Sequence, residues 1–346
     1  MNIRKVISVL ALLVFCSTAY AKDSFKFAWS HYTGWEPWAY AQDKGIVKKW
    51  ADKYGIEIKV ELVNDYIESI NLYTTGEYDG VTATNMDALT IPVVGGVDTT
   101  ALIVGDYSNG NDGLVARNAN SIKDLKNREV RLVELSVSHY MLSRALDKNG
   151  MSERDVKVVN QSDADIAAVF IADKNAVAVT WNPPLQKIQN AKGAKLLFDS
   201  SQIPGEIVDI AFVRTDSDER FKKALVGAWY ETLALMNGKN KQSRNALAYM
   251  ASVAGGTEAE FKAQLKTTAM FYKARDAVKF TNSKSLTKTM DDVRNFSFDK
   301  GLFGNGASSP DFVGIEMANG EVLGDKSNIK MRFTSKYMEM ADKGQL

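Results

Sequence analysis

The sequence predicts a two-lobed α/β protein in which each lobe contains a doubly wound, mostly parallel sheet. Short apolar strand candidates alternate with amphipathic helix candidates over the first two thirds of the chain. The chain has 346 residues, which is longer than a single hydrophobic core usually supports. Apolar residues make up 45% of the sequence, so two sizeable cores are expected.

The N-terminus has the pattern of a signal peptide. Arg4 and Lys5 precede an apolar run at 6–15, and a small-x-small motif ends at Ala21. The apolar run is shorter than the roughly 20 residues that a membrane-spanning helix needs. A buried strand would need neither the cationic start nor the small-residue end. We therefore predict a cleaved signal peptide at 1–21 and a periplasmic mature protein, which lacks cysteine because Cys16 is removed.

The first lobe is predicted from a β-α-β-α-β order. Residues 25–29 alternate with period two, which is typical of a half-buried strand. Pro37 marks the first turn of a helix that extends to Tyr54. The elements that follow are a strand at 56–62, a helix across 66–73, a strand at 80–83 and a helix from Asp87.

The second lobe repeats the alternation. We predict a strand at 128–134 and a helix at 138–149 with Ser138 as its N-cap. Further elements are expected at 156–159, 166–172, 176–180, 183–190 and 208–213, with mostly helical sequence after Ser217 and a Gly/Ser/Asn-rich stretch at 297–324. The predicted crossings at 105–112 and 200–209 assign residues 22–108 and 206–346 to lobe 1 and residues 109–205 to lobe 2.

Charge and composition limit the possible functions. Once Arg4 and Lys5 are removed with the signal peptide, basic and acidic residues nearly balance, so no basic field favours nucleic acid or an anionic membrane surface. The two histidines, His31 and His139, leave little for histidine catalysis or a zinc site. We expect no metal site and no cofactor.

Most candidate ligand-binding residues follow the predicted strands, because ligands of open α/β sheets bind beyond the carboxyl ends of the strands. Glu206 and Asp209 instead lie at the predicted return crossing between the lobes. The candidates are Tyr32, Trp35, Asn85, Asp87, Asp106, Asn109, Glu134, Ser138, His139, Trp181, Asn182, Glu206 and Asp209. The same strand ends carry Glu36, Thr84, Ser108, Asp112 and Ser136. The set contains several carboxylates and aromatics and no lysine or arginine. Such a lining repels anions and suits a small cation or a neutral amide.

Several candidates also have a structural interpretation. Glu36 and Asp87 fall at helix starts, where an acid caps free N–H groups. His139 fits an ordinary helix position, and 109–113 has the composition of a turn. Glu134 and Asp106 are the most suggestive acids, because each follows an apolar strand and neither is needed as a cap.

Four segments together resemble the nitrate, sulfonate and taurine class of periplasmic solute-binding proteins (NMT1/THI5-like). These segments are Trp35–Ala39, Thr84–Leu89, Ser136–Tyr140 and Val179–Pro183. Asn85–Pro92 and Val104–Gly113 resemble a subgroup that is encoded beside urea carboxylase-type enzymes and is implicated in uptake of urea or guanidinium-like compounds. Glu134 departs from the anion-binding relatives, in which a small residue is expected.

The resemblance implies a monomeric binding protein that is not an enzyme. It also implies a type II-like periplasmic-binding-protein fold whose lobes close on a ligand and then dock on an inner-membrane permease driven by an ATPase. We hypothesise that Glu134 and Asp106, from opposite lobes, accept bidentate hydrogen bonds from a planar cation. Trp181 or Trp35 would stack on its face, and Asn85 and Asn182 would fix its orientation.

Three alternatives keep the same fold. In the first alternative, the ligand is taurine, an aliphatic sulfonate or nitrate, and helix N-termini and hydroxyl groups hold it. An enzyme of the thiamine-pyrimidine synthesis type is disfavoured, because export would separate it from cytosolic substrates. A ligand-loaded partner of a membrane receptor fits the sequence as well as a transport component does.

Overall fold

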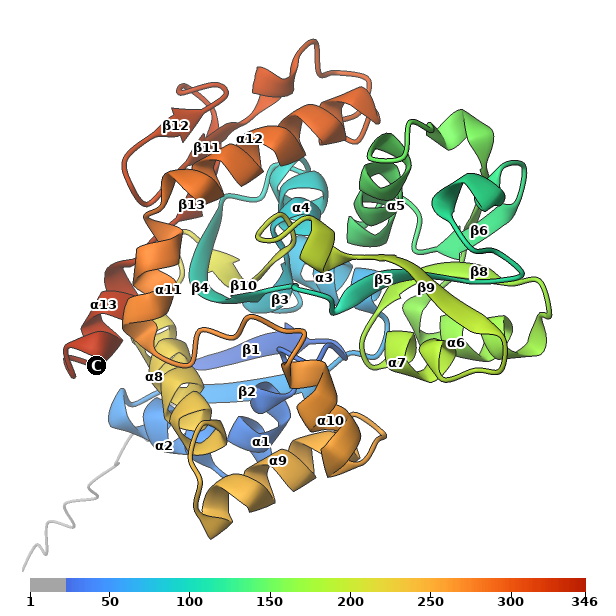
Figure 1. Ribbon diagram of the computed structural model, residues 1–346. Helices are drawn as coiled ribbons and strands as arrows, with labels where there is room; N and C mark the ends of the chain where they lie inside the picture. Colours follow the sequence, from blue (N-terminus) through green and yellow to red (C-terminus); the bar gives the residue numbers. More distant parts are fainter. Residues whose placement is uncertain (1–22) are drawn as a thin grey trace, which may run out of the picture.

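The computed structural model, described for residues 23–346, contains two β-sheets surrounded by helices (Figure 1). The predicted signal peptide and Cys16 lie outside the described residues. The larger sheet has the strand order β12-β11-β13-β4-β10-β3-β1-β2, and the smaller one has the order β7-β6-β8-β5-β9. The predicted α/β class with two sheets is confirmed.

The larger sheet combines strands from both ends of the chain. Its strands are β1 (Ser24–Trp29), β2 (Glu57–Leu62), β3 (Gly80–Thr84), β4 (Thr99–Tyr107), β10 (Val208–Arg214), β11 (Gly314–Glu316), β12 (Val322–Leu323) and β13 (Ile329–Phe333). β1 pairs in parallel with β2 and β3, whereas β10 is antiparallel to both β3 and β4. The sheet is therefore mixed, because the chain leaves along β4 and returns along β10.

The smaller sheet is built from one continuous segment. Its strands are β5 (Asp112–Arg117), β6 (Glu129–Leu132), β7 (Lys157–Asn160), β8 (Val177–Trp181) and β9 (Ala194–Asp199). β6 runs parallel to β7 and β8, and β5 runs antiparallel to β8 and β9. We keep the names lobe 1 and lobe 2, with the predicted division, for the parts that contain the larger and the smaller sheet.

Helices cover both sheets. Those of lobe 1 are α1 (Pro37–Asp43), α2 (Ile46–Lys53), α3 (Tyr66–Thr75), α4 (Asn85–Ala88), the π-helical η1 (Leu89–Val93), α8 (Glu219–Met236), α9 (Lys241–Val253), α10 (Glu258–Leu265), α11 (Ala274–Thr281), α12 (Lys284–Asp299), the 3₁₀ turn η5 (Pro310–Phe312) and α13 (Lys336–Asp342). Those of lobe 2 are α5 (Val137–Asp147), α6 (Asp163–Ala172), α7 (Pro184–Gln189) and the 3₁₀ turns η2 (Ile122–Leu125), η3 (Glu153–Asp155) and η4 (Ser200–Gln202).

Three local predictions are wrong. The single helix predicted from Pro37 to Tyr54 is divided into α1 and α2, because Gly45 adopts a left-handed conformation with φ of 72°. Helix α5 begins before Ser138, and Ser136 is its N-cap, with the Ser136 hydroxyl oxygen accepting a hydrogen bond from the Ser138 amide at 3.1 Å. Strand β6 ends at Leu132, two residues before Glu134.

One large hydrophobic core extends through lobe 1 and into lobe 2. The rings of Phe27 and Trp38 lie 4.7 Å apart, and Trp38 continues the stack to Trp229 at 5.0 Å. Buried residues of lobe 2, among them Leu114 and Trp181, belong to the same core. The two lobes are therefore packed against each other. Within residues 23–346, no helix combines the length and apolar character needed to cross a bilayer.

Candidate functional site

A small cavity lies where the two lobes meet. Its wall is formed by Tyr32, Trp35, Tyr66, Thr84, Asp112, Val137, Trp181 and Asp209. About 230 Å³ of this space is free of protein atoms. The cavity therefore suits a ligand of a few non-hydrogen atoms. None of the lining residues is lysine or arginine.

Three buried carboxylates lie in the wall of this cavity or directly behind it. Strand β10 pairs with β4 so that Asp209 stands opposite Asp106, and Asp112 begins β5. The three residues are between 0% and 3% exposed. The Tyr32 hydroxyl donates a hydrogen bond to Asp106 Oδ1 at 2.8 Å. Asp106 Oδ2 and Asp209 Oδ2 have no hydrogen-bond partner among the described residues. We call Asp106, Asp112 and Asp209 the acid triad.

The surroundings of the acid triad favour protonated carboxyl groups. Burial raises the pKa of Asp112 to about 7, although a hydrogen bond with Ser108 acts in the opposite direction. Burial also raises the pKa of Asp106. The pKa of Asp209 is also raised well above its ordinary value, first by burial and then by repulsion from Asp106 and Asp112. In the absence of a cationic side chain, protons or a bound cation must offset these charges.

Aromatic rings form the rest of the wall. The centroids of Trp35 and Tyr66 lie 5.9 Å apart with nearly parallel planes, Tyr32 lies 4.9 Å from Trp35, and Trp181 lies 5.3 Å from Tyr66. The Trp181 indole N–H donates a hydrogen bond to the His31 carbonyl oxygen at 3.1 Å, which joins the two lobes. Such a chain of aromatic faces favours a flat or cationic ligand.

Six of the residues predicted from the sequence lie at the cavity or directly behind it. Tyr32, Trp35, Trp181 and Asp209 form part of its wall. Asp106 lies behind Tyr32, and Asp87 lies behind Tyr66, whose hydroxyl donates to Asp87 Oδ2 at 2.6 Å. The amide of Val137, at the start of α5, also donates to Asp87 Oδ2, at 3.3 Å.

The remaining predicted residues are not part of the cavity wall; they are Asn85, Asn109, Glu134, Ser138, His139, Asn182 and Glu206. Asn85 and Asn182 hold the backbone, because their amide oxygens accept hydrogen bonds from the Val208 and Gln186 amides. Asn109 is exposed in the first crossing. The structure thus separates the polar residues that shape the chain from those that face the ligand space.

Glu134 lies on the surface, in a shallow groove with Asp65, Asn160 and Asp163. The hypothesised pairing of Glu134 with Asp106 is therefore not formed. The chain leaves β6 before Glu134, and the next residue, Leu135, adopts a left-handed conformation with φ of 63°. Asp112 is the acid that lobe 2 contributes to the cavity wall.

His139 and Glu206 take part in contacts outside the cavity. His139 Nδ1 accepts a hydrogen bond from the Leu135 amide at 3.1 Å, so its Nε2–H points to Glu153 Oε2 at 3.2 Å. Glu206 accepts hydrogen bonds from the Tyr140 hydroxyl and the Arg144 guanidinium. Both residues therefore stabilise the chain around α5 without reaching the ligand space.

Helix α12 of lobe 1 lies near α5 of lobe 2 (Figure 1). Lys300, which follows α12, forms an ion pair with Glu153 at 2.6 Å, and Phe296 meets the Tyr140 ring edge-on at 4.8 Å. Burial alone would raise the pKa of Glu153, but its hydrogen bonds with His139 and Lys300 outweigh that effect and lower the pKa to about 2. These contacts hold the lobes together independently of a ligand.

The remaining wall residues, Tyr66, Thr84, Asp112 and Val137, are not among the predicted ligand-binding residues. Thr84 and Asp112 stand at predicted strand ends, but Asp112 was interpreted as part of a turn. Tyr66 follows the strand at 56–62, so the same strand-end rule applied there would have found it. Val137 has no polar signal, and only the packing of α5 places it in the wall.

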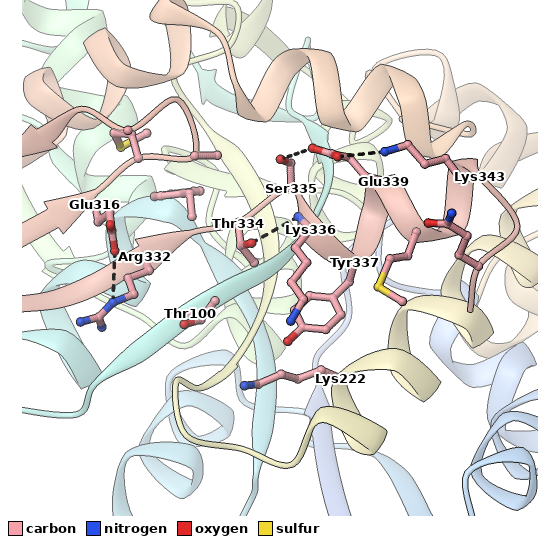
Figure 2. Close-up of a pocket in the computed structure, with 16 residues that line it drawn as sticks. Thr100, Lys222, Glu316, Arg332, Thr334, Ser335, Lys336, Tyr337, Glu339 and Lys343 are labelled. Carbon is pink, nitrogen blue, oxygen red and sulfur yellow. Dashed lines mark hydrogen bonds and ion pairs between the residues drawn. The ribbon is translucent and has the colours of Figure 1, made fainter.

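A wider groove lies on lobe 1, along β13 and α13 (Figure 2). Its charged side chains are already paired: Lys336 with Glu219 at 2.9 Å, and Arg332 with Glu316 at 3.3 Å. It shares no residue with the cavity between the lobes.

Among the described residues, no group of three or more His, Cys, Asp and Glu side chains is arranged to hold a metal ion.

Replacing Asp112 with asparagine should remove a pH-dependent cost to stability. The folded pKa of about 7 lies above the unfolded value of about 4, so the stabilising contribution is fully present below pH ~4 and is lost as the pH rises through ~7. Relative to Asp112→Asn, the ligand-free wild type should lose roughly 4 kcal/mol between pH 4 and 8. Calorimetric unfolding across this range measures the difference, and Glu134→Gln is the control. A wild-type-minus-variant difference that is constant with pH would contradict the expectation.

Replacing Lys300 with alanine should loosen the closed arrangement of the lobes. A partly buried ion pair of this kind contributes about 1 kcal/mol, so the open fraction should rise about fivefold. Distances between two spin labels, one on each lobe, measure this change in the ligand-free protein. Lys288→Ala is the matched control, because Lys288 forms an exposed pair with Asp292 on the same helix. Equal distance distributions for the two variants would show that the Lys300–Glu153 ion pair does not hold the lobes closed.

The fold is shared with solved structures that include binding proteins and an enzyme. The alkanesulfonate-binding protein SsuA from Xanthomonas axonopodis pv. citri bound to MOPS is similar with a TM-score of 0.68 and 15% identity, over 82% of this chain and 96% of that chain. The periplasmic aliphatic sulphonate binding protein SsuA from Escherichia coli gives 0.66 and 14%, over 82% and 95%. The desulfurization enzyme DszB gives 0.55 and 14%, over 81% and 93%. Identities this low show a shared fold alone.

Of the two sequence comparisons, one found a match. No curated protein sequence matches the chain. Residues 40–216, just over half of the chain, match the family model described as NMT1/THI5 like. The protein therefore belongs to the NMT1/THI5-like family.

Proposed function

We propose that this protein is the periplasmic substrate-binding component of an ABC importer, which captures a small guanidinium- or urea-like nitrogen compound between its lobes and delivers it to a permease. Family membership and the fold shared with SsuA support the transport role. The observation that carries the choice of ligand is the acid triad in a small cavity whose wall has no basic side chain.

The two carboxylates in the cavity wall come from different lobes. Asp209 belongs to β10 of lobe 1, and Asp112 belongs to β5 of lobe 2. A planar cation between them would donate charge-assisted hydrogen bonds to both, and a guanidinium matches the two-oxygen geometry of a carboxylate. Because these bonds are complete only when the lobes are closed, ligand binding favours the closed state.

The aromatic wall would hold the flat faces of such a ligand. Trp35 and Tyr66 lie in roughly parallel planes, and Trp181 meets Tyr66 edge-on. A cation over an aromatic face gains about 0.5–2 kcal/mol, and the gain increases when water is excluded. The small free space favours a compact ligand over an alkanesulfonate with a long chain.

Taurine, an aliphatic sulfonate or nitrate is the alternative ligand class, and the relatives with the same fold support it equally. The local charge opposes it, because an anion would meet Asp112 and Asp209. The start of α5, where an anion would find free amides, already has the Asp87 carboxylate at the Val137 amide. A periplasmic location would also separate the protein from the cytosolic substrates of a thiamine-pyrimidine synthesis enzyme. Loss of ligand uptake when the gene is deleted would distinguish a transport component from a partner of a signalling receptor.

Thermal unfolding of the mature protein from Lys22 onward should identify the ligand class. Ligands that bind the native state raise the unfolding midpoint, with about 2.7 kcal/mol of added stability at 100 times Kd. We expect a rise with guanidinium or methylguanidine at sub-millimolar concentration, where denaturation is negligible, in matched chloride. Urea, taurine, nitrate and methanesulfonate complete the panel.

Two variants locate the binding site in the same assay. Asp209→Asn should weaken guanidinium binding at least tenfold, because it removes a charge from the cavity wall. Glu134→Gln should bind as the wild type does, because Glu134 lies outside the cavity. A midpoint that rises only with taurine, nitrate or methanesulfonate would refute the proposed ligand class.

A further inference from the structure

We infer that a cation enters the cavity in exchange for a proton held by the acid triad, so that the site distinguishes a guanidinium-type cation from a neutral urea-type compound by proton release. This inference rests on the proposed function of the cavity. Proton release on cation binding is a property that a pocket lined by fully ionised acids would lack.

The first support is the placement of two carboxylates on neighbouring strands. Asp106 and Asp209 stand opposite each other where β4 and β10 pair. Side chains directly opposite in antiparallel strands have their Cβ atoms about 5 Å apart. Two carboxyl groups at this separation, and at most 2% exposed, do not both ionise without a counter-charge. A single proton on the pair removes this repulsion.

The second support is the absence of a counter-charge around the triad. Tyr32 donates to Asp106 Oδ1, Ser108 contacts Asp112, and Asp87 and Tyr272 are the other titratable groups that face the cluster. None of these groups is a cation. Among the described residues, the two oxygens Asp106 Oδ2 and Asp209 Oδ2 have no hydrogen-bond donor. Both are free to hold a proton.

The exchange balances charge. In the ligand-free protein, the triad holds at least one proton near neutral pH. The same three carboxyl groups would all be ionised at this pH if they were exposed to water. When a monovalent cation enters, it supplies the positive charge, and the proton passes to solvent. A neutral amide brings no charge, so it leaves the proton in place. Affinity for the cation should therefore rise with pH, up to tenfold per pH unit, until the ligand-free triad has lost that proton.

Asp106 is the residue that distinguishes this mechanism from direct contact. It lies behind Tyr32 and does not form part of the cavity wall, whereas Asp112 and Asp209 do. We therefore assign Asp106 as a positioning residue that sets the proton occupancy of the triad. Asparagine at this position keeps an oxygen for the Tyr32 hydroxyl and removes one negative charge.

Isothermal titration calorimetry with guanidinium chloride tests the exchange directly. Titrations at one pH in buffers of different ionisation enthalpy give the number of protons released. We expect about one proton per guanidinium near pH 6.5 for the wild type, and a Kd that falls with rising pH. Asp106→Asn should bind guanidinium with fewer protons released than the wild type and with a shallower pH profile, because one negative charge of the triad is gone. Asp163→Asn, a buried acid outside the triad, is the matched control and should release protons as the wild type does.

A second measurement separates this inference from the proposed function. The infrared C=O band of a buried protonated carboxyl group should be present in the ligand-free wild type and reduced in Asp106→Asn. If no compound of the panel binds, the proposed function fails, and this band still decides whether the triad holds a proton. If guanidinium binds without proton release, or if the band is missing, the exchange is overturned while the binding function stands.

Discussion

The antiparallel pairing of β4 with β10 is the constraint on which the rest of this structure depends. The chain leaves lobe 1 along β4 and returns along β10, so the two crossings between the lobes lie side by side. The Ser108 amide donates to the Ile207 carbonyl oxygen at 3.0 Å, and the hydroxyls of Ser108 and Ser200 share a hydrogen bond of 2.7 Å. The same register places Asp106 opposite Asp209. The pairing of β4 with β10 therefore determines both how the chain connects the lobes and which two acids stand opposite each other.

Closure converts this local arrangement into an enclosed site. Asp112 and Trp181 reach the cavity from lobe 2, whereas Asp209 and Trp35 reach it from lobe 1. Contacts distant from the acid triad, such as the Lys300–Glu153 ion pair, hold the lobes in register. Because low dielectric strengthens every interaction in an enclosed space, closure raises both the cost of an unpaired carboxylate and the gain from a bound cation. The proposed ligand and the conformational state are thus coupled through charge.

Much of the site was predictable, because one rule of α/β sheets applies to it. Tyr32, Trp35 and Trp181 lie at or just beyond the carboxyl ends of β1 and β8, and all three lie in the cavity wall. Asp209, also in the wall, is the second residue of β10, whose amino end lies beside the carboxyl end of β4 because the two strands are antiparallel. The rule fails for Glu134, since β6 ends early and the left-handed Leu135 follows. Polar side chains such as Asn85 and Asn182 also satisfy the rule but hold the backbone. A strand-end position alone does not separate a ligand contact from a cap.

The sequence by itself determined the α/β class, the number of sheets and the acidic, aromatic character of the strand ends, because periodicity and residue type are local properties. Only the tertiary structure decided which of those acids share a cavity. Asp106 and Asp209 are separated by about a hundred residues in the chain, and their pairing depends on strand register, which non-local packing sets. Burial then determines whether a carboxylate is an exposed surface group, like Glu134, or a member of the acid triad.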